Sequence, residues 1–272
     1  MMSYSQSKRY CTGSKIASVQ SLTQAAASHV EGMVSRRRRR KSPHNSTGFR
    51  FLSALAQLLR TEKIRVRTLE DLRRDPKESS AADLDVHDPD LCGYCGTFAC
   101  CVYLKIRLKQ KKRTYETTVS KNSSQNQNPP LFPYWHFGAN ETELLIHESI
   151  HAVRIHLSKD VSPELFAELQ GWSFGTSNDP LYHTIEAREE WIAYTLSWYI
   201  QQFPVKRSLD SFSLGAIQWI ASIAQSSNSL YSGITDDLLQ QTQTKLNMRT
   251  LVEQTLMIAE NFGTVSLDSK KL

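Results

Sequence analysis

The sequence predicts an α+β fold that is mainly helical, with a small β-sheet or hairpin ahead of its central helix. Residues 102–108 alternate aliphatic side chains with Tyr103, Lys105 and Arg107, which is the period of a strand with one buried face. Polar and Pro-containing stretches separate this strand from the helical segments. Apolar residues recur at helical spacing in the rest of the chain, over about 140–158, 186–199, 212–224, 234–245 and 248–261.

The segment over 140–158 is predicted with the strongest pattern. Ile146, Ile150 and Val153 belong to one apolar stripe, and the stripe continues to Leu157. Asn140 is a candidate N-cap, and a Glu follows it three residues later, as in a capping box. We therefore expect a helix that buries one face and begins near residue 140.

This helix contains the motif His147-Glu148-Ser149-Ile150-His151. Two imidazoles one helical turn apart can bind a single zinc ion, and the Glu beside the first can accept a proton from a zinc-bound water. Two incidental histidines on a core helix are the alternative interpretation. The pair flanking a Glu in this register favours a metal site, with His147 and His151 as ligands and Glu148 as the catalytic base.

A catalytic zinc needs a third protein ligand and one open position. The helix over 186–199 carries two apolar stripes, with Glu186 and Glu190 in a polar seam between them. Buried carboxylates are costly unless they are paired or bound to metal, so the seam is the predicted zinc site. Glu189 lies nearer one apolar stripe and is a further candidate. The alternative is a solvated acidic start of a helix.

An HExxH motif followed by a second helix with Glu-x-x-Ala resembles the gluzincin branch of zinc metallopeptidases. The segment Glu190-Trp191-Ile192-Ala193 matches the second motif, and the resemblance implies that Glu190 is the third ligand. Many gluzincins have Asp or Asn after this Ala, where the present chain has Tyr194. The sequence from His147 to Arg154, with Glu189 and Glu190 downstream, is also similar to that of secreted effector metallopeptidases of bacterial pathogens. The resemblance implies a zincin-like sheet over the HExxH helix, with an edge strand that binds peptide by strand addition.

Charge divides the chain into two unlike halves. Residues 1–121 hold 24 Lys/Arg against 11 Asp/Glu, whereas 122–272 hold 9 against 16. We expect a disordered basic tail over 1–47, because its composition is polar and poor in large apolar residues. A basic segment over 48–128 then supplies a helix, a cysteine cluster and a hairpin. The zinc metallopeptidase helical region follows over 129–272.

Six consecutive cations, Arg36 to Lys41, mark the end of the tail. Such a run is typical of nuclear targeting, nucleic-acid contact or contact with an anionic surface, and a solvated basic linker is the simpler interpretation. No aromatic residue interleaves with these arginines, so the run does not predict a base-stacking platform.

Four of the five cysteines cluster at Cys92, Cys95, Cys100 and Cys101. The C-x-x-C pair is half of a structural zinc site, to which His87 could contribute. Small buried thiols leading into a strand are the alternative. The odd, clustered cysteines do not predict a disulfide framework, and reduced thiols suit a cytoplasmic protein.

The hairpin is predicted from residue 102 to residue 119, with a polar turn at Lys111-Lys112 and a second strand over 113–119. The aromatic-rich stretch 131–137 is expected to pack onto the HExxH helix. Tyr182, His183 and Tyr194 are candidates for stabilising an oxyanion, although each is of a type that more often packs as an aromatic side chain.

These observations predict a zinc-dependent metallopeptidase that acts on a peptide or protein. One rival is a non-catalytic protein whose basic N-terminal half binds nucleic acid or acidic partners. Another is a zinc amidohydrolase acting on a small molecule. No apolar run is long enough for a transmembrane helix, and the N-terminus lacks the apolar core of a signal peptide. We therefore expect a cytoplasmic protein, or one exported without a signal peptide.

Overall fold

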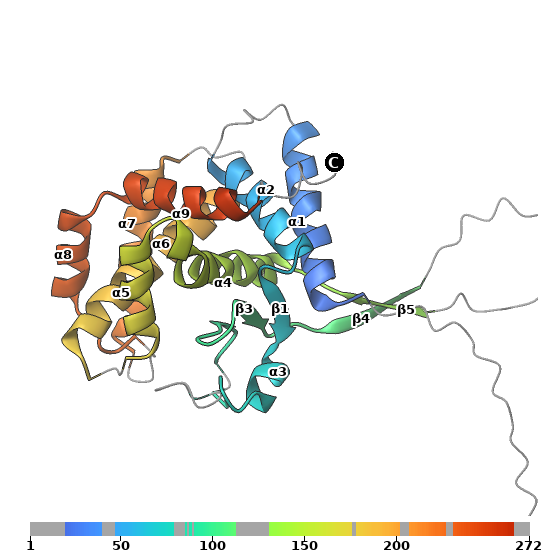
Figure 1. Ribbon diagram of the computed structural model, residues 1–272, viewed down its shortest axis with the longest axis horizontal. Coiled ribbons are helices and arrows are strands. Elements are labelled where there is room, and N and C mark those ends of the chain that lie inside the picture. Colours follow the sequence, from blue (N-terminus) through green and yellow to red (C-terminus); the bar gives the residue numbers. More distant parts are fainter. Residues whose placement is uncertain are drawn as a thin grey trace, which may run out of the picture.

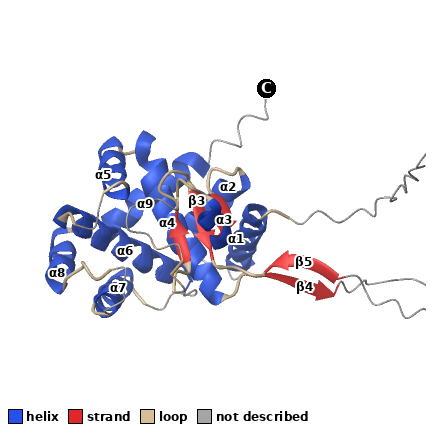
Figure 2. Ribbon diagram, turned by 90° about the horizontal axis from the view of Figure 1, so that it is seen from below, coloured by secondary structure: helices blue, strands red, loops and turns tan. Residues whose placement is uncertain are grey.

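The computed structural model describes residues 20–39, 47–78, 85, 87–88, 90–112, 131–175, 178–201, 207–226 and 231–263. Over these residues the chain is mainly helical and carries two small sheets, which confirms the predicted fold class (Figures 1 and 2). The elements are α1 Leu22–Arg39, α2 Thr47–Arg60, β1 Arg65–Thr68, α3 Leu69–Arg74, β2 Gly93–Cys95, β3 Cys101–Leu104, β4 Leu108–Lys112, β5 Leu131–Trp135, α4 Ala139–Leu157, a 3-10 turn Ser158–Asp160, α5 Pro163–Ser173, α6 Pro180–Gln201, α7 Leu209–Ala224, α8 Asp236–Lys245 and α9 Met248–Gly263.

Helix α4 lies at the centre of the helical body. It packs against α5, α6 and α9 and against strands β2 and β3 (Figure 1). Its predicted apolar stripe is buried, and so are the polar side chains on its other faces. A polar group buried in this way is costly unless it finds a partner. The buried histidines and charged residues of α4 therefore need polar or charged partners on the elements that pack around this helix.

The start of α4 differs from the prediction. Gly138 is the N-cap, and its N–H donates a hydrogen bond to Glu141 Oε2 at 3.0 Å. Asn140 is already inside the helix, so its assignment as the cap is wrong. Glu143 accepts a hydrogen bond from the indole of Trp198 on α6 at 2.6 Å instead of closing a capping box.

The larger sheet has the strand order β1-β3-β2, with β1 parallel and β2 antiparallel to β3. Strand β3 is buried on both faces, because Val102 and Leu104 join the main core while Cys101 and Tyr103 join a smaller cluster with α3. Strand β2 is an edge strand, and it packs against α4. The sheet thereby forms one wall beside the HExxH motif.

Residues 108–112 and 131–135 form a second sheet of two strands. Strand β4 pairs antiparallel with β5, in the register Leu108 to Trp135. Lys111 lies within β4, so the predicted turn at this position is wrong, and 113–119 lies outside the described residues. The predicted strand over 102–108 is also interrupted at 105–107, where the chain leaves the first sheet for the second. The β4–β5 ribbon projects from the helical body (Figures 1 and 2).

Helix α1 corrects the prediction of a disordered tail over 1–47. Residues 22–39 form a helix that packs on α2, and Ala26, Ala27 and Val30 are fully buried. The Thr23 hydroxyl donates to the Val66 carbonyl and accepts from the Val66 N–H, at 3.1 and 2.9 Å. Small residues let α1 approach its neighbours closely, so a helix with few large apolar residues still packs. Residues 1–19 and 40–46 are outside the described part.

A single main core draws side chains from α1 and α2, the first sheet, and the helices α4 to α9. The predicted C-terminal helices near 212–224, 234–245 and 248–261 are confirmed as α7, α8 and α9. No helix among the described residues has the length and apolar character needed to span a membrane.

Candidate metal centre

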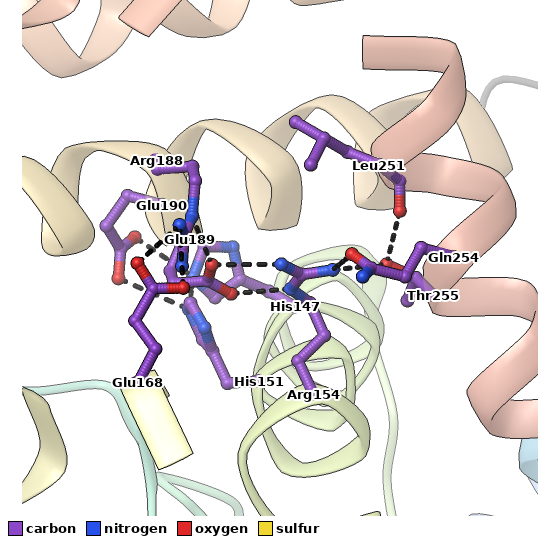
Figure 3. Close-up of polar contacts among 10 residues, drawn as sticks. All are labelled: His147, His151, Arg154, Glu168, Arg188, Glu189, Glu190, Leu251, Gln254 and Thr255. Atoms are coloured by element: carbon purple, nitrogen blue, oxygen red, sulfur yellow. Dashed lines mark hydrogen bonds and ion pairs between the residues drawn. The ribbon is translucent and has the colours of Figure 1, made fainter. Parts of the chain in front are cut away.

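Three side chains converge where α4 faces α6. His147 and His151 project from successive turns of α4, and Glu190 reaches them from α6. The Nε2 atoms of the two histidines are 3.2 Å apart. Glu190 Oε2 lies 3.3 Å from His147 Nε2, and Glu190 Oε1 lies 3.2 Å from His151 Nε2 (Figure 3). Among the residues that the structure describes, this is the one cluster of His, Cys, Asp or Glu able to hold a metal ion.

The spacing of these donor atoms fits a small tetrahedral cation. Zinc bonds His nitrogen and carboxylate oxygen at about 2.0–2.1 Å in tetrahedral geometry, which places neighbouring ligand atoms about 3.3 Å apart. The two Nε2 atoms are 3.2 Å apart, and they lie 3.3 and 3.2 Å from the two different oxygens of the Glu190 carboxylate. Glu190 Oε2 makes no well-aligned hydrogen bond although it is buried, as expected for an oxygen directed at a shared centre. The residues present therefore fit a bound divalent metal.

Electrostatics keep Glu190 ionised. Burial by itself raises the pKa of this carboxyl, but His151 and His147 outweigh burial and bring the pKa well below its usual range. A charged carboxylate and two imidazoles form a donor set that binds transition metals. The group could therefore accept a metal ion without first losing a proton from Glu190.

Glu148 lies beside this group, on the side of α4 that faces strand β2. It is buried, and it accepts a hydrogen bond from the Cys95 N–H. Burial raises its pKa to about 7, even though His147 acts in the opposite direction. A carboxyl group that titrates near neutrality is suited to exchange protons with a reacting molecule.

Gly93 on β2 makes room for this carboxylate. A Cβ atom at residue 93 would lie 2.9 Å from Glu148 Oε1 and 3.2 Å from its Cγ. Any larger side chain would displace Glu148, so the edge strand contributes to the site through the absence of a side chain. Nothing in the sequence pattern distinguishes Gly93, because only the packing of β2 on α4 reveals its role.

A pocket of about 200 Å³ opens beside the candidate ligands. Glu148, His151, Glu186 and Glu190 contribute polar groups to it. The rest of the wall is mainly apolar and aromatic, and includes Leu91, Tyr94, Ile155, Trp172, Tyr182 and Tyr231. A half-open pocket with aromatic walls and a few convergent polar groups is a common form of ligand site.

Glu189 is not a ligand of this centre. Its carboxylate is fully buried and forms a two-pronged ion pair with Arg154, at 2.5 Å to Nε and 3.0 Å to the terminal nitrogen (Figure 3). Arg188 contacts the same carboxylate at 2.8 Å. Burial opposes ionisation, but Arg154 lowers the pKa of Glu189 to about 2. Arginines therefore occupy the oxygens of Glu189, which lies outside the cluster of three.

Glu186 lies one turn before Glu190 and lines the pocket outside the cluster of three. Burial and the charge of Glu190 raise its pKa to about 8. Its nearest polar partner is His183 Nδ1, at 3.4 Å. Glu186 is thus a buried carboxyl group that faces the pocket and lies outside the cluster of three.

The aromatic residues predicted to stabilise an oxyanion have different neighbours in the structure. The ring of Tyr194 packs on that of His147 with their centroids 4.5 Å apart, and its hydroxyl contacts Trp219 and Tyr231. Tyr182 lines the pocket, whereas His183 lies against Glu186. Tyr231, which the sequence analysis missed, lines the pocket near Glu148 and Glu190. The polar loop around it gave no signal in the sequence.

The four clustered cysteines do not gather into a second metal site in the part of the chain that the structure describes. All four are free thiols, of which Cys92 is exposed. Cys95 faces the main core and Cys101 faces the smaller cluster, because neighbouring strands place them on opposite sides of the sheet. Burial raises the pKa of the thiols of Cys95, Cys100 and Cys101, which disfavours the thiolate that binds metal.

The cationic run is partly structural. Arg36 and Arg38 are exposed near the end of α1, but Arg37 is buried and donates to the Ile200 carbonyl on α6. The helix ends at Arg39, and Arg40 and Lys41 lie outside the described residues. Because one of its arginines anchors α1, the run is not a uniform solvated track.

Comparison with models of protein families, with curated proteins and with solved structures gave no match. Functional inference therefore depends on the site itself.

Proposed function

We propose that the protein is a zinc-dependent metallopeptidase of gluzincin type, with His147, His151 and Glu190 as the zinc ligands. The carrying observation is that two imidazole Nε2 atoms and one carboxylate, supplied by two helices, lie within 3.2–3.3 Å of one another, close to the separation of tetrahedral zinc ligands, with Glu148 next to them in one pocket. The same four residues are those that the HExxH and Glu-x-x-Ala resemblance assigns. Geometry and resemblance support the proposal independently, because the resemblance used sequence spacing alone.

Each residue has a role that follows from its surroundings. Zinc, when bound, supplies a Lewis acid that acidifies water and polarises a carbonyl group. Glu148 accepts a proton from the attacking water and passes a proton to the leaving amine. Burial raises the pKa of Glu148 above the usual carboxyl value, which favours its acceptance of a proton. The N–H of Cys95 orients this carboxylate, and Gly93 leaves space for it.

Tyr231 is better placed than Tyr194 or His183 to stabilise the oxyanion. It lines the pocket, whereas Tyr194 packs on His147 and His183 lies against Glu186. Burial and the nearby Glu190 raise the pKa of Tyr231, so its hydroxyl keeps the proton that it would donate. Tyr231→Phe should lower kcat by about 10²-fold while zinc content stays the same. An equal loss in Tyr194→Phe and none in Tyr231→Phe would reverse the assignment.

The proposal is tested by Glu148→Gln in the zinc-loaded full chain. The amide keeps the shape of the side chain but cannot accept the proton, so hydrolysis of a mixed peptide library should fall by at least about 10²-fold. Peptide products are measured by mass spectrometry, and Glu164→Gln, which changes an exposed Glu on α5, is the matched control. Undiminished hydrolysis by Glu148→Gln would rule out this mechanism.

A further inference from the structure

The β4–β5 ribbon projects away from the helical body and from the candidate metal centre (Figures 1 and 2). Its first strand is strongly basic, and Arg107, Lys109 and Lys111 are exposed. No Asp or Glu occurs in residues 101–112 or 131–140 to offset these charges. A two-stranded ribbon is only marginally stable by itself in water, which raises the question of what binds to it.

Strand pairing brings together two features that the sequence keeps apart. Lys109 lies opposite Tyr134, and Lys111 lies opposite Phe132. Directly opposed residues of an antiparallel pair share one face, so this face alternates cations with aromatic rings. His136, two residues beyond Tyr134, extends the row and packs edge-on against the Tyr134 ring. The cationic run at Arg36–Lys41 has no such interleaving.

A hollow of about 370 Å³ lies between β5 and α1. The rings of Phe132, Tyr134 and His136 border it from the ribbon, and Ser28 and His29 border it from the helix. His29 stacks on Phe137 with the ring centroids 4.8 Å apart. Its pKa is lowered to about 4 by burial and by the charges of Arg36 and His136, so its ring is neutral at physiological pH. The hollow thus offers aromatic surfaces beside exposed cations.

We propose that this ribbon face, with the hollow beside it, is a binding surface for single-stranded nucleic acid. Single strands are held by cations that contact phosphates and by aromatic side chains on which bases stack, and the register supplies both on one face. A duplex keeps its bases stacked on one another and cannot use the rings. Arg36 lies two turns after His29 on the same side of α1 and extends the cationic surface past the hollow.

An anionic membrane fits these features less well. Surfaces that enter the headgroup region carry large exposed apolar residues together with cations. Here the rings are half-buried along a hollow, and the sequence between the two strands is rich in Ser, Asn, Gln and Thr. Leu108 is the one large apolar side chain of the described ribbon residues that is exposed, which is little apolar surface for insertion.

The proposal is independent of the proposed peptidase function, because no residue of the ribbon lines the pocket beside the candidate ligands. Metal chelation and Glu148→Gln should both leave nucleic-acid binding unchanged. A protein that binds nucleic acid but has no zinc would keep this inference and remove the other.

The test is fluorescence anisotropy of labelled oligo(dT) with the full chain, over a series of salt concentrations. Lys109→Gln/Lys111→Gln should weaken binding by about tenfold or more and reduce the salt slope of log K by about 1.4, since each phosphate contact of a single strand contributes about 0.7. Tyr134→Leu should weaken binding by about tenfold with the salt slope unchanged, because it removes stacking and no charge. Lys159→Gln/Lys245→Gln, which changes two exposed lysines on other elements, is the matched control and should bind as the wild type does.

Three results would overturn the proposal. The first is the absence of oligo(dT) binding by the wild type, even if the protein sediments with phosphatidylserine vesicles. The second is equal weakening by the two lysine pairs, which would indicate non-specific attraction. The third is binding of duplex as tightly as single strand with no effect of Tyr134→Leu. Circular dichroism of each variant establishes that a loss of binding does not reflect unfolding.

Discussion

Single atoms decide how Glu148 can act, and Gly93 provides the sharpest test at this scale. In Gly93→Ala the new Cβ would lie 2.9 Å from Glu148 Oε1, so the carboxylate must move. A shift of about 1 Å at a catalytic group can cost about 10²-fold in rate. We expect kcat/KM for peptide hydrolysis to fall by this order while zinc content is retained.

The control is Gly171→Ala on α5, where a Cβ meets no atom within 4 Å. This change should leave activity intact and stabilise the helix by about 1 kcal/mol. If both alanine variants retained full activity, the close approach of β2 would have no catalytic consequence.

Glu186 gives a pH dependence that can be measured without substrate. Its pKa is about 8 in the folded chain against a usual value of 4.5, mainly through burial. The folded chain therefore keeps a proton that the unfolded chain releases, and stability falls as the pH rises from about 4.5 to about 8. Glu186→Gln removes this cost, so the metal-free variant should be more stable than wild type above pH 8, by up to about 4 kcal/mol.

Thermal unfolding in the presence of a chelator, at a series of pH values, measures this difference. The gain in Tm should disappear below about pH 4.5, where the carboxyl is protonated in both states. A gain that did not vary with pH would show that burial of Glu186 does not disfavour its charge.

At the scale of helices, the ion pair between Arg154 and Glu189 connects α4 to α6. Arg154 also donates to Gln254 and Thr255 on α9, at 3.3 and 3.1 Å (Figure 3). Because Glu189 precedes Glu190, the pair holds α6 in the rotation that directs Glu190 at the histidines. The C-terminal helix therefore supports the candidate metal centre although it contributes no ligand.

Arg154→Met should destabilise the fold by about 3–5 kcal/mol, since it leaves Glu189 buried without its main partner. The double variant Arg154→Met/Glu189→Met removes the uncompensated charge and should recover most of that loss. Urea unfolding of the two single variants and the double variant measures the coupling. Additive losses would mean that the pair does not act as a unit.

The elements also show what the sequence could predict. The pattern at 147–151 and the seam at Glu190 identified the candidate centre, because helical spacing translates directly into shared faces. Periodicity does not predict which strands pair when they lie 20 or more residues apart in the sequence. Strand β4 pairs with 131–135, a partner that the sequence pattern did not predict. The choice among Glu186, Glu189 and Glu190 from the residues alone required knowing where Arg154 lies.

At the scale of the whole molecule, the basic and acidic halves of the chain do not form two separate bodies. Side chains from α1, α2 and the basic segment enter the same core as α4 to α9. The prediction of a disordered tail was wrong at α1. The low content of large apolar residues suggested that the segment could not pack, but α1 packs through Ala and Val. The fold therefore depends on residues well before the HExxH motif.

Val30→Asp tests this dependence, because it places a charge at a fully buried position of α1. We expect a loss of about 3 kcal/mol or more in the free energy of unfolding. Ser35→Asp introduces the same charge at an exposed position of α1 and should change stability by no more than about 0.5 kcal/mol. Equal stability of the two variants would contradict the packing of α1.

The most direct test of the central claim is zinc per chain, measured by elemental analysis of the purified full-length protein. Wild type should hold about one zinc, and His147→Ala and Glu190→Ala should each lose it, whereas Glu189→Gln and Glu148→Gln should retain it in folded protein. Wild type that holds no zinc after metal supplementation, or Glu190→Ala that retains it, would contradict the assignment of His147, His151 and Glu190 as a zinc centre.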